Sequence, residues 1–316
     1  MCPHGSKHAT LLFAHGGGFC RQTWDPIIRR LRASSLLQSV DPSQFVTFDF
    51  PFHGTKRDKS VTPVVNRETM RVEHPCRYWV EWATEEVYQQ VQALPSRASG
   101  DFLTRAPLIG IGHSMGAVAL WNTEVKHPGT FDGLILFEPI YAMHRLSSPK
   151  TTDFLVSITL DREYKWPTLD AATRYFESFR NFAAWDRESL KSYIDGAVVQ
   201  DDDKTSFSLA CHPEIEASIY CADTLDLADV ELTRPQCRTI LLNGERTKMY
   251  KREFFVDLAD SLPDIYKVEP SMANTSHLMV LENPEDSAAR ILKGLTEFIA
   301  FQGDDDATTN LSASRL

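Results

Sequence analysis

The segment that most constrains the fold is the pentapeptide Gly112-His113-Ser114-Met115-Gly116. An apolar run at residues 107–111 precedes it, and a helical pattern at residues 115–126 follows it. Glycines on both sides of a serine let a strand turn sharply into a helix, and the turn holds the serine hydroxyl exposed at the edge of a sheet. The helix N-terminus behind it favours developing negative charge. The pentapeptide therefore predicts a strand–turn–helix unit with Ser114 as a nucleophile.

Apolar runs typical of strands alternate with helical periodicity along most of the chain. The runs typical of strands are residues 9–14, 45–49, 107–111, 133–137, 239–242 and 265–269. The helical segments are residues 25–37, 78–93, 115–126, 251–262 and 286–301. This alternation predicts an α/β fold in which helices flank a mostly parallel sheet.

Residues 141–236 interrupt the alternation. They carry helical runs at 169–184, 187–195 and 213–222, and they lie between two strand units. We expect this insertion to form a helical cap over the sheet edge. The predicted core then comprises residues 1–140 and 237–302, and the polar residues 303–316 form a flexible tail.

A glycine-rich loop follows the first strand and reads His15-Gly16-Gly17-Gly18-Phe19. A serine hydrolase needs backbone N–H groups that point at the oxyanion of its tetrahedral intermediate. Glycines let a backbone approach the substrate closely. We expect one donor from Met115, next to the nucleophile, and another from Gly17 or Gly18.

The predicted base is His277, which lies after the last strand and before the last helix. Its acidic partner has two candidates. Glu138 follows the strand after the Ser114 helix, and Glu245 follows the next-to-last strand, where Thr247 occupies the position at which an Asp usually falls. A carboxylate at either place would orient the imidazole and stabilise its charged form. We favour Glu138 over Glu245.

Composition excludes several other functions. The chain has 33 Lys and Arg against 43 Asp and Glu, for a net charge of −10, which disfavours nucleic-acid binding and a polybasic membrane anchor. No apolar run approaches the ~20 residues of a membrane span. The six cysteines form no CxxC pair or zinc spacing, so we expect reduced thiols in an intracellular protein and no metal.

Further motifs carry a resemblance to known proteins. They are Trp24-Asp25-Pro26, Asp49 with His53-Gly54, Phe137-Glu138-Pro139 and residues 208–217. With the two glycine motifs, they resemble the α/β-hydrolase superfamily over nearly the whole chain. A closer resemblance is to fungal peroxisomal hydrolases of secondary metabolism, which include a mycophenolic acid acyl-CoA hydrolase, hydrolases of Alternaria host-selective toxin clusters and a yeast peroxisomal lipase. The resemblance implies an acid at Glu138.

The start of the chain departs from this resemblance. Eight residues precede the run at 9–14, whereas the superfamily usually has two more strands there. Either the sheet is trimmed at that edge or the sequence lacks its start. At the other end, Ser314-Arg315-Leu316 is close to the Ser-Lys-Leu address that the peroxisomal import receptor reads. We therefore expect a peroxisomal protein, with the cytoplasm as the alternative.

These features together predict a serine hydrolase without a cofactor. Ser114 would attack a small-molecule ester or acyl-CoA thioester, and Phe19 and Tyr141 would shape an apolar acyl pocket. An acyl-CoA hydrolase of fungal secondary metabolism, such as toxin biosynthesis, is favoured by the resemblance and the peroxisomal address. A carboxylesterase or lipase and a non-catalytic binding protein remain alternatives, and a homodimer is left open.

Overall fold

Six apolar runs form one parallel sheet in the computed structural model, which describes residues 9–38, 43–95, 106–143 and 149–301. The strands are β1 (Thr10–Ala14), β2 (Gln44–Thr47), β5 (Leu108–His113), β6 (Gly133–Phe137), β10 (Thr239–Leu242) and β11 (Tyr266–Val268). Their order across the sheet is β11-β10-β6-β5-β1-β2, and every pair is parallel. The predicted α/β fold with a mostly parallel sheet is confirmed.

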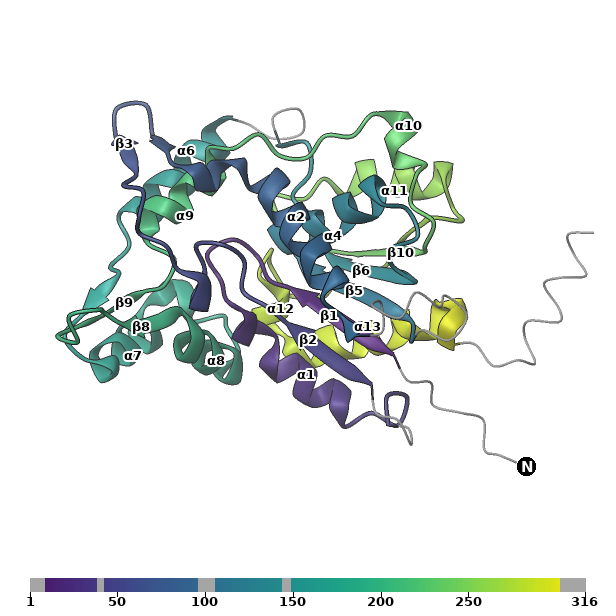
Figure 1. The fold of residues 1–316 in the computed structure, drawn as a ribbon, viewed down its shortest axis with the longest axis horizontal. Helices are drawn as coiled ribbons and strands as arrows, with labels where there is room; N and C mark the ends of the chain where they lie inside the picture. Colours follow the sequence, from purple (N-terminus) through teal and green to yellow (C-terminus); the bar gives the residue numbers. More distant parts are fainter. Residues whose placement is uncertain (1–8, 39–42, 96–105, 144–148, 302–316) are drawn as a thin grey trace, which may run out of the picture.

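Each face of the sheet is buried under helices, because successive side chains of a strand point to opposite faces. In β6, Leu134 and Leu136 join one hydrophobic core, whereas Ile135 and Phe137 join the other. One face is covered by α2 (Trp79–Gln92), α4 (Met115–Lys126) and α11 (Arg252–Ser261), and the other by α1 (Asp25–Arg32) and α13 (Pro284–Glu297) (Figure 1).

Several predicted helix ends differ from the structure, and two of them have a local reason. The helix expected over 25–37 ends at Arg32, and the Ser34 hydroxyl beyond it accepts the Leu36 amide at 3.3 Å. Such side-chain bonds compete with helical ones. The last helix begins at Pro284 because Asn283 caps it and accepts the Asp286 amide at 2.9 Å.

The insertion between β6 and β10 contains a second, smaller sheet. Its helices are α6 (Pro149–Leu160), α7 (Leu169–Ser178), α8 (Arg187–Ala197), α9 (Pro213–Tyr220) and α10 (Asp229–Leu232). The antiparallel strands β7 (Lys165–Trp166), β9 (Phe207–Leu209) and β8 (Val198–Gln200) form the small sheet. The sequence does not indicate this small sheet, because strands of two or three residues are too short to show a period. In Figure 1, α6 to α9 lie to one side of the main sheet. The division at residues 141 and 236 stays a prediction.

The remaining elements are short. A hairpin pairs β3 (Val64–Asn66) with β4 (Arg71–Glu73), and α12 (Met279–Glu282) precedes α13. The 3-10 helices are Arg21–Trp24, Gly54–Lys56, Pro75–Tyr78, Arg180–Phe182 and Ile299–Phe301. Within the described ranges, no helix combines the length and apolar character needed to cross a membrane. The cysteines that the structure describes, from Cys20 to Cys237, are free thiols.

Candidate active site

Ser114 lies at the sharp turn between β5 and α4. Its backbone has φ 55° and ψ −119°, a conformation that L-residues rarely adopt, and its amide donates to the Phe137 carbonyl at 2.9 Å. Gly116 leaves room for this turn, because a Cβ there would clash with the carbonyl of Ala14 on the neighbouring strand. The strained turn places the Ser114 hydroxyl at the carboxyl edge of the sheet, as the sequence predicts.

The Ser114 hydroxyl contacts an imidazole that in turn contacts a carboxylate. His277 Nε2 lies 3.0 Å from Ser114 Oγ, and His277 Nδ1 lies 2.6 Å from Glu138 Oε2. A carboxylate oxygen only accepts hydrogen bonds, so Nδ1 carries the proton and Nε2 is left as an acceptor. This arrangement lets the imidazole take a proton from the hydroxyl while the carboxylate stabilises the charge that forms.

Glu138 is fully buried, and three donors surround its carboxylate. Besides His277, the Gly244 amide donates to Oε1 at 2.8 Å, and the Thr247 hydroxyl donates to Oε2 at 2.8 Å. The alternative acid, Glu245, points elsewhere and accepts the Asn274 amide at 2.8 Å. The carboxylate in contact with the His277 ring is thus the one at the end of β6.

The loop that carries His277 is held from two directions. His113 Nε2 donates to the His277 carbonyl at 2.8 Å, and the carboxylate of Glu282 accepts both the amide and the hydroxyl of Ser276 at 2.6 Å. Neither contact is predictable from the sequence, because the partners of His113 and Glu282 depend on how the loop folds back. Burial lowers the pKa of His113 to about 3, so the ring is neutral.

The glycine loop after β1 packs directly against the nucleophile turn. A Cβ at Gly16 would lie 3.2 Å from Ser114 Cβ, and one at Gly17 would lie 3.8 Å from Met115 Sδ. Met115 is the first residue of α4, so its amide belongs to the helical turn whose N–H groups have no intrahelical acceptor. The amides of Gly17 and Met115 thus lie on the two segments that border Ser114.

Gly18 is not available as an oxyanion donor, and its assignment to that site is wrong. Its amide donates to His53 Nε2 at 3.0 Å, so the N–H is already used inside the protein. Gly18 is required for another reason: its φ is +76°, and a Cβ there would lie 2.5 Å from the carboxyl carbon of Glu216. Of the two glycines that the sequence proposed, Gly17 alone remains a candidate.

A cavity of about 900 Å³ opens above Ser114 and reaches into the insertion. Its wall includes Ser114, His277 and Phe19 together with side chains of α6, α8 and α9. Phe19 belongs to an aromatic group there, with its ring centroid 5.9 Å from both Trp185 and Tyr193. A concave, largely apolar site with a few polar groups is typical of small-molecule binding.

Tyr141 does not line this cavity, so its predicted contact with substrate is wrong. Its ring is 3% exposed and packs against Trp121 and Phe254 in the core beside α4. Its hydroxyl donates to the Leu227 carbonyl at 3.2 Å and accepts the Leu227 amide at 2.9 Å. Tyr141 fastens one end of the insertion to the other.

One wall of the cavity carries a buried ion pair that the sequence did not indicate. Arg162, which follows α6, contacts the carboxylate of Glu216 on α9 through both terminal nitrogens, and the Tyr220 hydroxyl donates to Glu216 Oε1 at 3.1 Å. The Glu216 side chain is 5% exposed. The neighbouring Glu216 raises the pKa of Arg162 further against the effect of burial. The pair keeps a negative charge beside Gly18 neutralised.

Two further points concern the targeting motif and metal binding. The targeting residues Ser314, Arg315 and Leu316 lie outside the described residues. Within the described part of the chain, no group of three or more His, Cys, Asp and Glu side chains is arranged to hold a metal ion.

Comparison with known proteins identifies the family to which the chain belongs. The sequence profile of the "Alpha/beta hydrolase family" matches residues 11–290. A solved peroxisomal α/β-hydrolase from Saccharomyces cerevisiae, Lpx1, superposes with a TM-score of 0.70 at 18% identity, covering 99% of this chain and 88% of that chain. At that identity the likeness shows the shared fold.

Two curated relatives match shorter segments. The abhydrolase domain-containing protein AFT2-1 of Alternaria alternata is 30% identical over 95 residues, which are 30% of this chain and 35% of that protein. The type I acyl-CoA thioesterase mpaH' of Penicillium brevicompactum is 36% identical over 70 residues, 22% of this chain and 16% of that protein. The matches span about a third or less of the relatives' length. The profile match covers most of the sequence, and the chain belongs to the α/β-hydrolase family.

Proposed function

We propose that this protein is a serine hydrolase that cleaves an acyl thioester or ester through an acyl-enzyme. The observation that carries the proposal is the continuous contact from Ser114 Oγ through His277 to Glu138 at the floor of the cavity. The base lies within hydrogen-bond distance of the nucleophile on one side and of the orienting acid on the other, which is the geometry this chemistry needs.

The reaction follows from these contacts in two halves. Ser114 Oγ attacks the acyl carbonyl while His277 Nε2 takes the proton of the Ser114 hydroxyl. The oxyanion that forms accepts hydrogen bonds from the Gly17 and Met115 amides. The intermediate collapses, the thiol or alcohol leaves with the proton from His277, and the acyl group stays on Ser114. A water molecule then gives a proton to His277 and attacks the acyl-enzyme. The acid is released, and Ser114 recovers its proton.

We further propose an acyl-CoA as the substrate and secondary metabolism, including toxin biosynthesis, as the setting. An acyl-CoA thioesterase and an Alternaria abhydrolase protein among the relatives support this choice. The cavity has a volume of about 900 Å³ and contains the aromatic group around Phe19, so it suits an acyl chain with substantial apolar area. A carboxylesterase or lipase would use the same three residues and is the second candidate.

The test is release of free thiol from a panel of acyl-CoA thioesters. We expect Ser114→Ala and Glu138→Ala to lower kcat by about 10³-fold or more. Glu245→Ala is the matched control, because its carboxylate contacts the Asn274 amide rather than His277, and it should keep the activity. Hydrolysis of simple esters or glycerides without thiol release would favour the esterase. Absence of both activities, together with absence of labelling by a fluorophosphonate, would favour a binding protein.

A peroxisomal location is proposed on the Ser314-Arg315-Leu316 motif and on the likeness to a peroxisomal hydrolase of the same fold. A fluorescent protein that carries the last ten residues of the chain tests it. Co-localisation with a peroxisomal marker, lost when Leu316 is deleted, would support the address, and diffuse fluorescence would favour the cytoplasm.

A further inference from the structure

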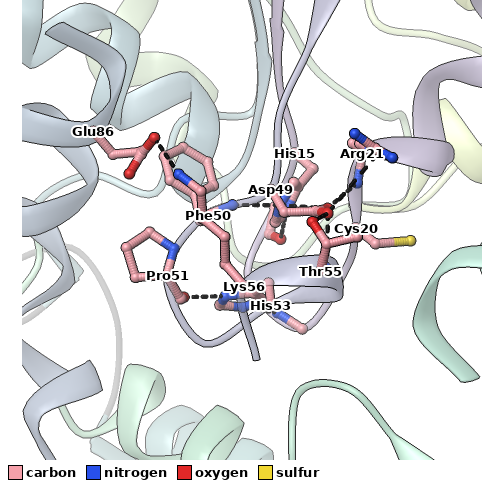
Figure 2. Close-up of polar contacts among 12 residues, drawn as sticks. His15, Cys20, Arg21, Asp49, Phe50, Pro51, His53, Thr55, Lys56 and Glu86 are labelled. Carbon is pink, nitrogen blue, oxygen red and sulfur yellow. Dashed lines mark hydrogen bonds and ion pairs between the residues drawn. The ribbon is translucent and has the colours of Figure 1, made fainter. Parts of the chain in front are cut away.

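A buried polar cluster contacts the glycine loop and does not contribute to the cavity wall. Asp49 is its centre: the carboxylate accepts the Arg21 amide at 2.8 Å and the amide and hydroxyl of Thr55 at 2.9 and 2.8 Å. Figure 2 shows Asp49 between His15, Arg21 and Thr55, with His53 nearby. The cluster therefore joins the loop after β1 to the loop after β2.

The contacts of His53 fix which of its ring nitrogens carries the proton. Nδ1 lies 2.8 Å from the Pro51 carbonyl, which only accepts, so Nδ1 is the protonated nitrogen. Nε2 is then a lone-pair acceptor, and the Gly18 amide donates to it at 3.0 Å. Burial lowers the pKa of His53, which keeps the ring in this neutral form. A charged ring would present an N–H to the Gly18 N–H and break the bond.

His15, the residue before the loop glycines, also forms two hydrogen bonds through its ring nitrogens. Its Nε2 accepts the Phe50 amide at 3.1 Å, so its Nδ1 carries the proton and donates to the Gly16 carbonyl at 2.8 Å. The Gly16 carbonyl and the Gly17 amide belong to one planar peptide group. The two successive peptide groups around Gly17 are thus each held by an imidazole from behind the loop.

We propose that His53 is a positioning residue for the oxyanion site. Its Nε2 holds the Gly18 amide, and this fixes the peptide group that follows Gly17, so that the Gly17 amide stays aimed at the substrate carbonyl oxygen. Three consecutive glycines have an unusually wide choice of backbone conformations. Without an acceptor behind Gly18, the loop would leave the donor geometry that oxyanion stabilisation needs. This inference rests on the proposed serine hydrolase function.

A second contact at Gly18 makes the anchor more important. The Glu216 carboxylate sits against Gly18 from the insertion, with no space for a Cβ between them. If the Gly18 amide were released from His53, this carboxylate would be a strong acceptor close to the loop. His53 therefore keeps the loop from turning its N–H groups towards α9 and away from Ser114.

The experiment compares His53→Gln with His53→Asn in the full chain. The Gln carboxamide oxygen reaches about as far as Nε2, whereas the Asn oxygen is one methylene short. We expect His53→Asn to lower kcat about 10- to 100-fold with KM changed less than about twofold. We expect His53→Gln to stay within a few-fold of wild type. A trifluoromethyl ketone that adds to Ser114 reports the oxyanion site directly, and its inhibition constant should rise in His53→Asn by the same factor.

His74→Asn is the matched control. His74 is also buried and accepts a backbone amide, that of Cys76 at 3.1 Å, but it lies outside the cavity wall and the glycine loop. Equal loss of kcat in His53→Asn and His74→Asn would overturn the inference, and so would a fall in kcat without weaker binding of the ketone. Unchanged kcat in His53→Asn would do the same. If wild-type protein neither turns over esters or thioesters nor reacts with a fluorophosphonate, the proposed function fails instead.

Discussion

At the scale of single residues, the side chains of Glu138 and Thr247 meet from the loops that follow two neighbouring strands, β6 and β10. The Thr247 hydroxyl donates to Glu138 Oε2, the same oxygen that contacts His277 Nδ1. Thr247 stands where folds of this type usually carry an aspartate. Thr247 therefore lies next to the carboxylate that contacts the outer nitrogen of His277, and we expect a carboxylate at either position to reach that nitrogen.

This convergence predicts that the acid can be moved. Glu138→Ala should lower kcat by about 10³-fold or more, because His277 loses the group that orients it. Adding Thr247→Asp should recover at least about tenfold, since the new carboxylate enters the space that Glu138 leaves. Steady-state kinetics on the best thioester or ester measures both changes.

The control for this prediction is Thr247→Asn in the Glu138→Ala background. Asn has the shape of Asp but no charge, so it should not restore activity. Equal recovery with Asn and Asp would mean that shape rather than charge is restored. No recovery with either would mean that residue 247 does not reach His277.

The sequence predicts the position of a residue where a local pattern determines it. It does not predict a position that depends on contacts with residues far away in the chain. Ser114 follows from its glycines, and the placement of His277 and Glu138 follows from the ends of strands. Gly18 was misassigned because its amide partner, His53, lies 35 residues away. Tyr141 was misassigned because its partner, Leu227, lies 86 residues away. No local pattern contains these pairings.

At the scale of elements, the ion pair between Arg162 and Glu216 fastens α6 to α9 and sets α9 against the glycine loop. Both side chains are mostly buried, at 18% and 5% exposed. Removing one partner of a buried pair leaves an uncompensated charge, which costs far more than the net value of the pair. The contact thus contributes more to the arrangement of these elements than to total stability.

We therefore expect Arg162→Met to lower the free energy of unfolding by about 3 kcal/mol. The double variant Arg162→Met with Glu216→Gln should recover most of this loss, because the amide removes the isolated charge and keeps a group that can accept from Tyr220. Urea unfolding followed by tryptophan fluorescence measures each variant. A loss of less than about 1 kcal/mol in Arg162→Met, or no recovery in the double variant, would contradict this account.

The small sheet of the insertion shows why part of this architecture escaped the sequence. The main strands bury both faces and read as continuous apolar runs, as in β1 and β10. In contrast, β7 has two residues, and β8 and β9 have three each. Strands this short show no period, so the sequence of the segment indicates its helices and not the small sheet.

At the scale of the whole molecule, neutral histidines are built into the interior around the site. His15, His53 and His113 are fully buried, and each makes a hydrogen bond to the backbone of a loop at the sheet edge. Burial lowers the pKa of His15 and of His113 to about 3, and it lowers that of His53 as well. In the unfolded chain the same side chains titrate near 6.5.

This difference predicts a loss of stability in mild acid. Between pH 6.5 and about 3 the unfolded state binds protons that the folded state refuses, so the free energy of unfolding falls as the pH falls. From pH 6 to pH 5 each such histidine should lower the free energy of unfolding by about 1 kcal/mol. His15 and His113 together should lower it by about 2 kcal/mol. Urea unfolding at the two pH values measures the change.

The control is His113→Gln, which removes one titrating group and keeps a donor for the His277 carbonyl. Its free energy of unfolding should fall by about 1 kcal/mol less than that of the wild-type protein between pH 6 and pH 5. Equal stability of the wild-type protein at pH 6 and pH 5 would show that these rings are not held neutral.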